Sequence, residues 1–170
     1  MNLIIFKIIG SAFVAFSGIS IGEFLKQQLN QRLAQLDDMI KIVSTVSDEI
    51  DYLDCDYNSI KEKLLMDRTL KHSDFLEKYK TKTYSSFPLQ WREAVSEANF
   101  ITSQKSREEF LIIGDIIGSY QKDLQLKHLK IIETNLKRER DELREYIKTH
   151  SKLYKSLSAL VSIAIIIIMI

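Results

Sequence analysis

Residues 122–170 read KDLQLKHLKIIETNLKRERDELREYIKTHSKLYKSLSALVSIAIIIIMI and contain the most regular pattern in the chain. Two positions of this stretch repeat every seven residues: the first series is Leu129, Leu136, Leu143, His150 and Leu157, and the second is Ile132, Glu139, Tyr146, Leu153 and Leu160. This spacing is typical of the seam along which one long helix packs against another. Because neither Pro nor Gly interrupts the stretch, it predicts one continuous helix, whose apolar seam is broken only at Glu139 and His150.

A second long helix is predicted closer to the amino terminus. From Leu25 to Leu53, apolar residues recur at steps of three and four, which marks one face of a helix. Only 6 of the 170 residues are Gly or Pro, far fewer than the tight turns of a β-sandwich or barrel need. The sequence therefore predicts an all-α fold, a membrane-anchored antiparallel helical hairpin or bundle with short capping helices at its far end.

The capping helices are expected to begin near Ser59, near Ser73 and Asp74, near Pro88, and after Ser103 or Ser106. Ser59 and Glu62 have the spacing of a capping box, in which the Ser59 hydroxyl accepts from the backbone amide of Glu62. Pro88 suits the first turn of a helix, where its missing amide proton has no partner to lose. Gly118 is placed where the last capping helix would end in the left-handed conformation.

The charged residues divide the chain into three parts. Residues 1–22 carry one charge, at Lys7, and residues 156–170 carry none, whereas residues 23–155 carry the other 46. As helices the two apolar segments would measure about 33 Å and about 22 Å, against a hydrocarbon core of about 30 Å. We predict an N-terminal transmembrane helix at 1–22, a cytoplasmic helical domain at 23–155 and a C-terminal transmembrane segment at 156–170, whose flanking lysines would snorkel. The alternatives are a cleaved signal peptide and a buried helix tail.

The basic residues indicate which side of the membrane the domain faces. Nine of them flank the two segments on the domain side: Lys26, Arg32, Lys137, Arg138, Arg140, Arg144, Lys148, Lys152 and Lys155. Only Lys7 and the terminal amine lie on the other side. Since cytoplasmic flanks carry the excess of Lys and Arg, we expect a cytoplasmic domain with both termini outside the membrane.

Residues for catalysis or metal binding are scarce. The formal net charge of +1 gives no electrostatic reason to expect nucleic-acid binding. His72, His128 and His150 are too far apart for a local metal site, and the single cysteine, Cys55, can form neither an internal disulfide nor a cysteine-based zinc site. No nucleophile, base and orienting group occur in a recognisable set. We therefore expect no enzymatic activity, no metal and no cofactor.

Two pairs of glycines are candidate helix-contact sites. Gly18 and Gly22 are four residues apart in the first predicted membrane helix, so they share a face that lets another helix approach closely. Gly114 and Gly118 have the same spacing in the domain. A glycine inside a helix costs about 1 kcal/mol relative to alanine, so Gly114 is expected at a close helix crossing, either within the domain or with a partner.

Several features follow one another in a characteristic order: the glycine-containing first segment, then Trp91 and Ala94, then Ile113, Gly114, Ile117, Gly118 and Ser119 followed by Gln125, and last the basic helix that runs into an apolar end. In this order and spacing the chain resembles the stage III sporulation protein AB family of endospore-forming Firmicutes. The resemblance adds Gln125 to the four glycines as a candidate partner residue.

The resemblance implies a role that the residues alone do not give. Such proteins belong to a channel complex between mother cell and forespore and resemble the platform protein of type II secretion and type IV pilus machines. The resemblance implies a non-enzymatic scaffold in the mother-cell membrane facing the forespore. Its expected partners are a cytoplasmic secretion-type ATPase of the same operon, other membrane proteins of the channel, membrane lipid and further copies of itself. The alternative is a membrane-anchored coiled-coil signalling module that responds to lipid or pH through His150.

Overall fold

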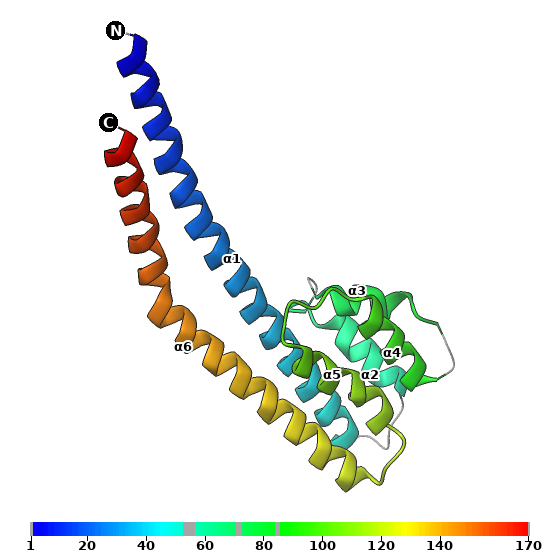
Figure 1. Ribbon diagram of the computed structural model, residues 1–170. Coiled ribbons are helices and arrows are strands. Elements are labelled where there is room, and N and C mark those ends of the chain that lie inside the picture. Colours follow the sequence, from blue (N-terminus) through cyan, green and yellow to red (C-terminus); the bar gives the residue numbers. More distant parts are fainter. Residues whose placement is uncertain (1, 53–56, 71–72, 84–85, 170) are drawn as a thin grey trace. The chain divides into compact units, whose positions relative to one another are not determined.

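The computed structural model is all-helical over the part of the chain that it describes, which comprises residues 2–52, 57–70, 73–83 and 86–169 (Figure 1). The helices are α1 (Asn2–Tyr52), α2 (Tyr57–Met66), α3 (Asp74–Thr81), α4 (Phe87–Glu97), α5 (Gln104–Ile116) and α6 (Lys122–Met169). No strand occurs within these ranges. Side chains are not described for residues 1–19, 21–22, 57, 151–155, 157–159, 162–163 and 165–170.

The chain forms two compact units. Residues 32–141 make up one of them, and residues 1–31 with 142–170 make up the other. In the first unit, the carboxyl half of α1 and the amino half of α6 run antiparallel (Figure 1). Arg32 pairs with Glu139 at 2.7 Å and Asp51 pairs with Lys122 at 3.4 Å. These contacts confirm the predicted hairpin for the part of it that lies in this unit.

The two predicted seams form the core of this unit. On α1, every apolar seam residue from Leu36 to Ile50 is buried, namely Leu36, Ile40, Val43, Val46 and Ile50. On α6, Leu129, Ile132 and Leu136 are buried, and Leu143 at the start of the other unit is buried as well. The heptad pattern therefore identified the packing face of α6 correctly from Leu129 to Leu143, whereas Tyr146 and Leu160, later members of the predicted seam, are exposed.

The short helices follow one another in space as they do in the sequence, since α2 contacts α3, α3 contacts α4 and α4 contacts α5. Aromatic rings from α3, α4 and α5 hold the last three together. The Trp91 ring lies 4.7 Å from Phe75 and 5.1 Å from Phe110 between centroids, and Trp91 Nε1 donates to the Phe110 carbonyl at 2.7 Å. Such aromatic pairs contribute beyond the area that they bury.

Most predicted helix starts are confirmed. Asp74 begins α3, Pro88 lies in the first turn of α4, and Ser103 is the N-cap of α5, where its hydroxyl accepts from the Ser106 amide at 3.1 Å. The predicted capping box at Ser59 is wrong, because α2 begins two residues earlier, at Tyr57. The Ser59 hydroxyl instead donates to the buried carboxylate of Glu49 at 3.0 Å.

Within the described residues, no helix is both long enough and apolar enough to cross a bilayer. The predicted transmembrane segments, 1–22 and 156–170, consist largely of residues whose side chains the structure does not describe, so both segments stay predictions.

In the unit that contains both termini, the His150 ring stacks on Tyr146 with centroids 4.2 Å apart. His150 Nδ1 lies 3.0 Å from the Tyr146 carbonyl oxygen.

Candidate functional site

Gly114 lies where α5 crosses α4. A Cβ atom built on Gly114 would lie 3.1 Å from Cβ and Cδ1 of Trp91, closer than carbon atoms normally approach. Gly114 itself is buried, and Trp91 has no exposed surface. The close crossing predicted for Gly114 is therefore present, and it lies within the domain. Because α4 already covers this side of Gly114, the crossing leaves no free face here for a partner protein.

Gly118 and Gln125 shape the turn between α5 and α6. Gly118 has a φ of 82°, a left-handed conformation that costs glycine little and other residues more. Gln125 is buried, and its side-chain amide donates to the Tyr120 carbonyl at 2.6 Å, while its Oε1 accepts from the Gly118 amide at 3.4 Å. The structure thus brings Gly118 and Gln125 together at this turn, whereas Gly114 lies one helical turn earlier on α5, against Trp91. Gly18 and Gly22, the other two predicted contact residues, lie outside the residues with described side chains.

Glu139, one of the two breaks in the predicted seam, joins three helices. One carboxylate oxygen accepts from Arg32 of α1 at 2.7 Å, and the other accepts from the Ser103 hydroxyl at 2.5 Å and from the Ser106 hydroxyl. The Ser103 amide also donates to Glu139, at 3.2 Å. Glu139 on α6 therefore contacts the N-cap residue of α5, and its ion pair with Arg32 connects both helices to α1.

The donors around Glu139 favour its charged form. Burial by itself would raise the pKa of this carboxyl, but the hydrogen bonds from Ser103, Ser106 and Arg32 outweigh burial and lower the pKa to about 2. A half-buried carboxylate is otherwise unfavourable at a seam position, and these donors compensate for its lost hydration. Sequence reasoning identified Glu139 only as an irregularity. The signal that it missed was the pair of hydroxyl residues at the start of α5.

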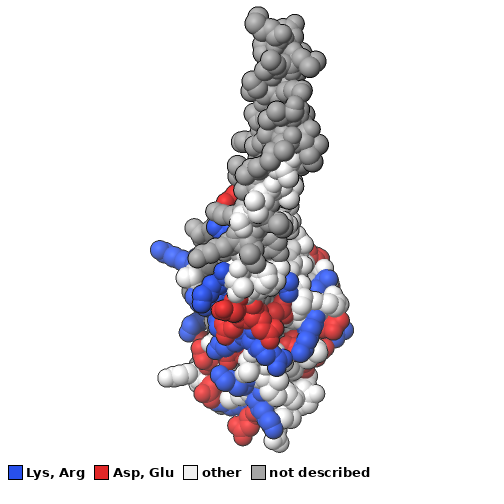
Figure 2. All heavy atoms as spheres, turned by 60° about the vertical axis from the view of Figure 1, so that its left-hand side comes forward, with Lys and Arg blue, Asp and Glu red and all other residues white. Residues whose placement is uncertain are grey.

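Charged side chains on the surface of the 32–141 unit largely pair with one another. Figure 2 shows acidic and basic side chains intermixed over the described part of the face that it presents. On α6, Glu133 pairs with Lys137 at 2.5 Å and with Lys130 at 3.0 Å. Between α4 and α5, Arg92 pairs with Asp115 at 2.8 Å. On that face a group of acidic side chains near the middle is bordered by basic ones.

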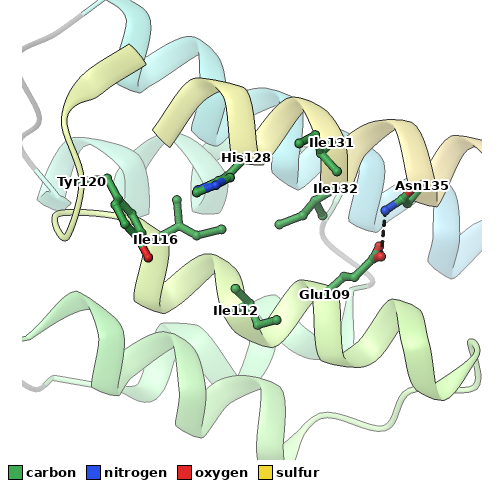
Figure 3. A pocket seen from close by; sticks show the side chains of 8 residues that line it. All are labelled: Glu109, Ile112, Ile116, Tyr120, His128, Ile131, Ile132 and Asn135. Carbon is green, nitrogen blue, oxygen red and sulfur yellow. Dashed lines mark hydrogen bonds between the residues drawn. The ribbon is translucent and has the colours of Figure 1, made fainter. Parts of the chain in front are cut away.

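An apolar groove lies between α5 and α6 (Figure 3). It has a volume of about 260 Å³ and is lined by Glu109, Ile112, Ile116, Tyr120, His128, Ile131, Ile132 and Asn135. Ile112 on the α5 side is 48% exposed and Ile131 on the α6 side is 50% exposed, so large apolar side chains face water at both edges. At one end the Tyr120 ring lies edge-on to His128, with centroids 5.3 Å apart.

Glu109 is the only acidic residue that lines this groove. Its Oε1 accepts from the Asn135 amide at 2.8 Å, as Figure 3 shows. Its Oε2 is sealed from solvent and has no hydrogen-bond partner among the described residues. Sequence reasoning did not single out Glu109, because its position in the groove depends on how α5 packs against α6.

Within the described residues, no group of His, Cys, Asp or Glu side chains could hold a metal ion. The carboxylates of Glu49 and Glu139 accept hydrogen bonds from neighbouring side chains, and these contacts join helices. These contacts stabilise helix packing in the 32–141 unit, and the groove between α5 and α6 offers room for another molecule.

These features define a chain that is helical over its described residues, with an antiparallel pair of helices, from α1 and α6, in the 32–141 unit. A sequence profile of the family described as stage III sporulation protein AB matches residues 7–170. The chain belongs to this family, as its sequence features predicted, and so has a role in stage III of sporulation. No curated protein and no solved structure matches the chain significantly.

The crossing at Gly114 predicts a large penalty for a bulky residue there. Leucine favours helix over glycine by about 0.8 kcal/mol, so Gly114→Leu would stabilise an exposed site. Against Trp91 we expect it to lower the free energy of unfolding by about 2 kcal/mol, the usual cost of overpacking a core. Thermal unfolding of the purified full chain measures the change.

The matched control for this prediction is Lys105→Leu, at an exposed position of the same helix. It adds a similar side chain without a close neighbour and should change stability by no more than about 0.5 kcal/mol. If Gly114→Leu were as stable as Lys105→Leu, the crossing would tolerate a side chain and the packing argument would be wrong.

Proposed function

We propose that the chain is a non-enzymatic membrane scaffold of the sporulation channel between mother cell and forespore. Its helical domain would dock a cytoplasmic secretion-type ATPase to the membrane components of that channel. The observation that carries this proposal is the family match over residues 7–170, which covers nearly the whole chain. The choice of ATPase rests on the likeness to the platform proteins of secretion and pilus machines.

The described domain is compatible with such a role. Its polar clusters fasten helices to one another: Glu139 joins α1, α5 and α6, and Glu49 joins α1 to α2 through Ser59 and Lys63. A domain fastened in this way can hold a binding surface in a fixed shape. Apolar side chains on α5 and α6 that remain exposed, such as Ile112 and Ile131, supply surface for contacts between proteins.

We also propose that segments 1–22 and 156–170 anchor the domain in the mother-cell membrane, with both termini outside. This proposal rests on the nine basic residues that flank the segments on the domain side, against Lys7 on the other. Anchoring at both ends would keep the domain at the membrane surface, where a recruited ATPase could act on membrane partners.

Recruitment of the ATPase tests the scaffold proposal. In sporulating cells that contain the chain, we expect the ATPase to sediment with the membrane fraction. In cells that lack the chain, it should move to the soluble fraction and return on complementation. A membrane protein of the same channel serves as the control and should sediment in both strains. An ATPase that stays on the membrane without the chain would contradict the proposal, and failed sporulation with unchanged ATPase distribution would favour the signalling alternative.

Thiol labelling tests the topology. Lys80 is exposed on α3, so Lys80→Cys in a chain that carries Cys55→Ala provides one accessible thiol. A membrane-impermeant maleimide should label it only after the cell membrane has been opened. Labelling in intact cells would place the domain outside and overturn the proposed orientation.

A further inference from the structure

We propose that α6 enters the membrane at Thr149 and not at Ser156, and that the exposed aromatic side chains of Phe24 and Tyr146 lie in the headgroup layer of the bilayer. The partner of this surface is phospholipid. The inference rests on the proposed membrane anchors and deepens them, because it states where each long helix meets the lipid headgroups.

The length of the second anchor gives the first reason. Residues 156–170 number 15 and measure about 22 Å as a helix, against about 30 Å of hydrocarbon. A boundary at Thr149 makes this anchor 22 residues long, the same length as segment 1–22. Since α6 is helical without a break from Lys122 to Met169, no helix end marks a start at Ser156.

The positions of the acidic residues give the second reason. No Asp or Glu occurs in residues 1–22 or in residues 146–170, whereas Glu23 and Glu145 directly adjoin these two stretches. A carboxylate is costly inside a bilayer and is repelled by the negative surface of the cytoplasmic leaflet. A lysine near a helix end can instead extend its ammonium group to the headgroups, so the lysines between residues 149 and 156 are compatible with a boundary at Thr149.

Exposed apolar side chains at both proposed boundaries give the third reason. Phe24, two residues beyond segment 1–22, is 59% exposed, and its neighbour Leu25 is 39% exposed. On α6, Tyr146 is 40% exposed and its ring stacks on that of His150. Aromatic side chains, tyrosine in particular, are enriched where membrane and water meet, because their rings are apolar and a hydroxyl can remain hydrated. A headgroup layer at these positions would cover surface that is otherwise unfavourable in water.

Counting along the two long helices gives the same boundary. Arg32 on α1 pairs with Glu139 on α6 at 2.7 Å. Gly22, the last residue of the first anchor, lies ten residues before Arg32, and Thr149 lies ten residues after Glu139. Ten residues of helix measure about 15 Å, whereas a boundary at Ser156 would need about 26 Å of α6. Equal lengths of helix between the ion pair and the bilayer suit two helices that enter the same membrane surface.

Spin labelling of the full chain in vesicles of phosphatidylcholine and phosphatidylglycerol tests the boundary. In a chain that carries Cys55→Ala, a nitroxide label is attached to Ser156→Cys. Its relaxation by oxygen, which partitions into hydrocarbon, is compared with its relaxation by a water-soluble nickel chelate. We expect oxygen to be the stronger relaxant, because position 156 would lie about 10 Å inside a boundary at Thr149.

Other positions on the same helices serve as controls. Glu142→Cys lies on the water side under either boundary, so nickel should be the stronger relaxant there, and Leu160→Cys lies on the lipid side, where oxygen should be. Both side chains are exposed, so neither label disturbs the packing of the helices. Phe24→Cys and Thr149→Cys, at the proposed boundaries, should respond to both relaxants.

The outcomes separate this inference from the proposed anchors. If nickel is the stronger relaxant at position 156 and oxygen at position 160, the membrane segment begins at Ser156, so the inference is wrong while the anchors stand. A label at position 156 that neither relaxant reaches is covered by protein, which also overturns the inference. If nickel is the stronger relaxant at position 160 as well, the anchor proposal itself fails.

Discussion

The arrangement of the 32–141 unit depends on one carboxylate, that of Glu139. It accepts hydrogen bonds from Arg32 on α1 and from Ser103 and Ser106 at the start of α5. The first helix of the chain and its last two, α5 and α6, thus meet at one charged group. Because a partly buried charge is costly without partners, this group specifies a single packing of α1, α5 and α6 and disfavours others.

In the same unit, one kind of side-chain packing stabilises the α1–α6 hairpin and another kind stabilises the short helices. The α1 and α6 seams bury aliphatic side chains such as Leu36 and Leu136, which have no exposed surface. Helices α3, α4 and α5 instead pack through aromatic rings, and the rings of Phe75, Trp91 and Phe110 all contact one another. Gly114 is what lets α5 approach Trp91 closely, and it links the aromatic cluster to the α5–α6 turn.

Local sequence signals predicted most of the fold but little of the surface. Heptad spacing located the α6 seam, and Pro88, Ser103 and Gly118 marked helix ends, because each acts through its own backbone or its near neighbours. Ser59 was misassigned because its hydroxyl bonds to Glu49, ten residues away, in preference to the local backbone. Glu139 and Glu109 depend on partners 26 or more residues distant, and no local pattern encodes such contacts. Gln125 entered only through the family resemblance, and the structure places it inside the turn after α5.

The most direct test of the role of Glu139 is the pH dependence of stability in wild type and Glu139→Gln. The folded pKa of about 2 lies below the ordinary 4.5, so this carboxylate stabilises the fold above about pH 5, and its contribution is lost as the pH falls toward 2. In thermal unfolding of the full chain, the wild type should be more stable than Glu139→Gln by about 2 kcal/mol at pH 7, and the difference should shrink steadily between pH 5 and pH 2. Glu142→Gln, at an exposed position, should match the wild type throughout. Equal stability of wild type and Glu139→Gln at pH 7, or a difference that does not change with pH, would contradict the central place given to this carboxylate.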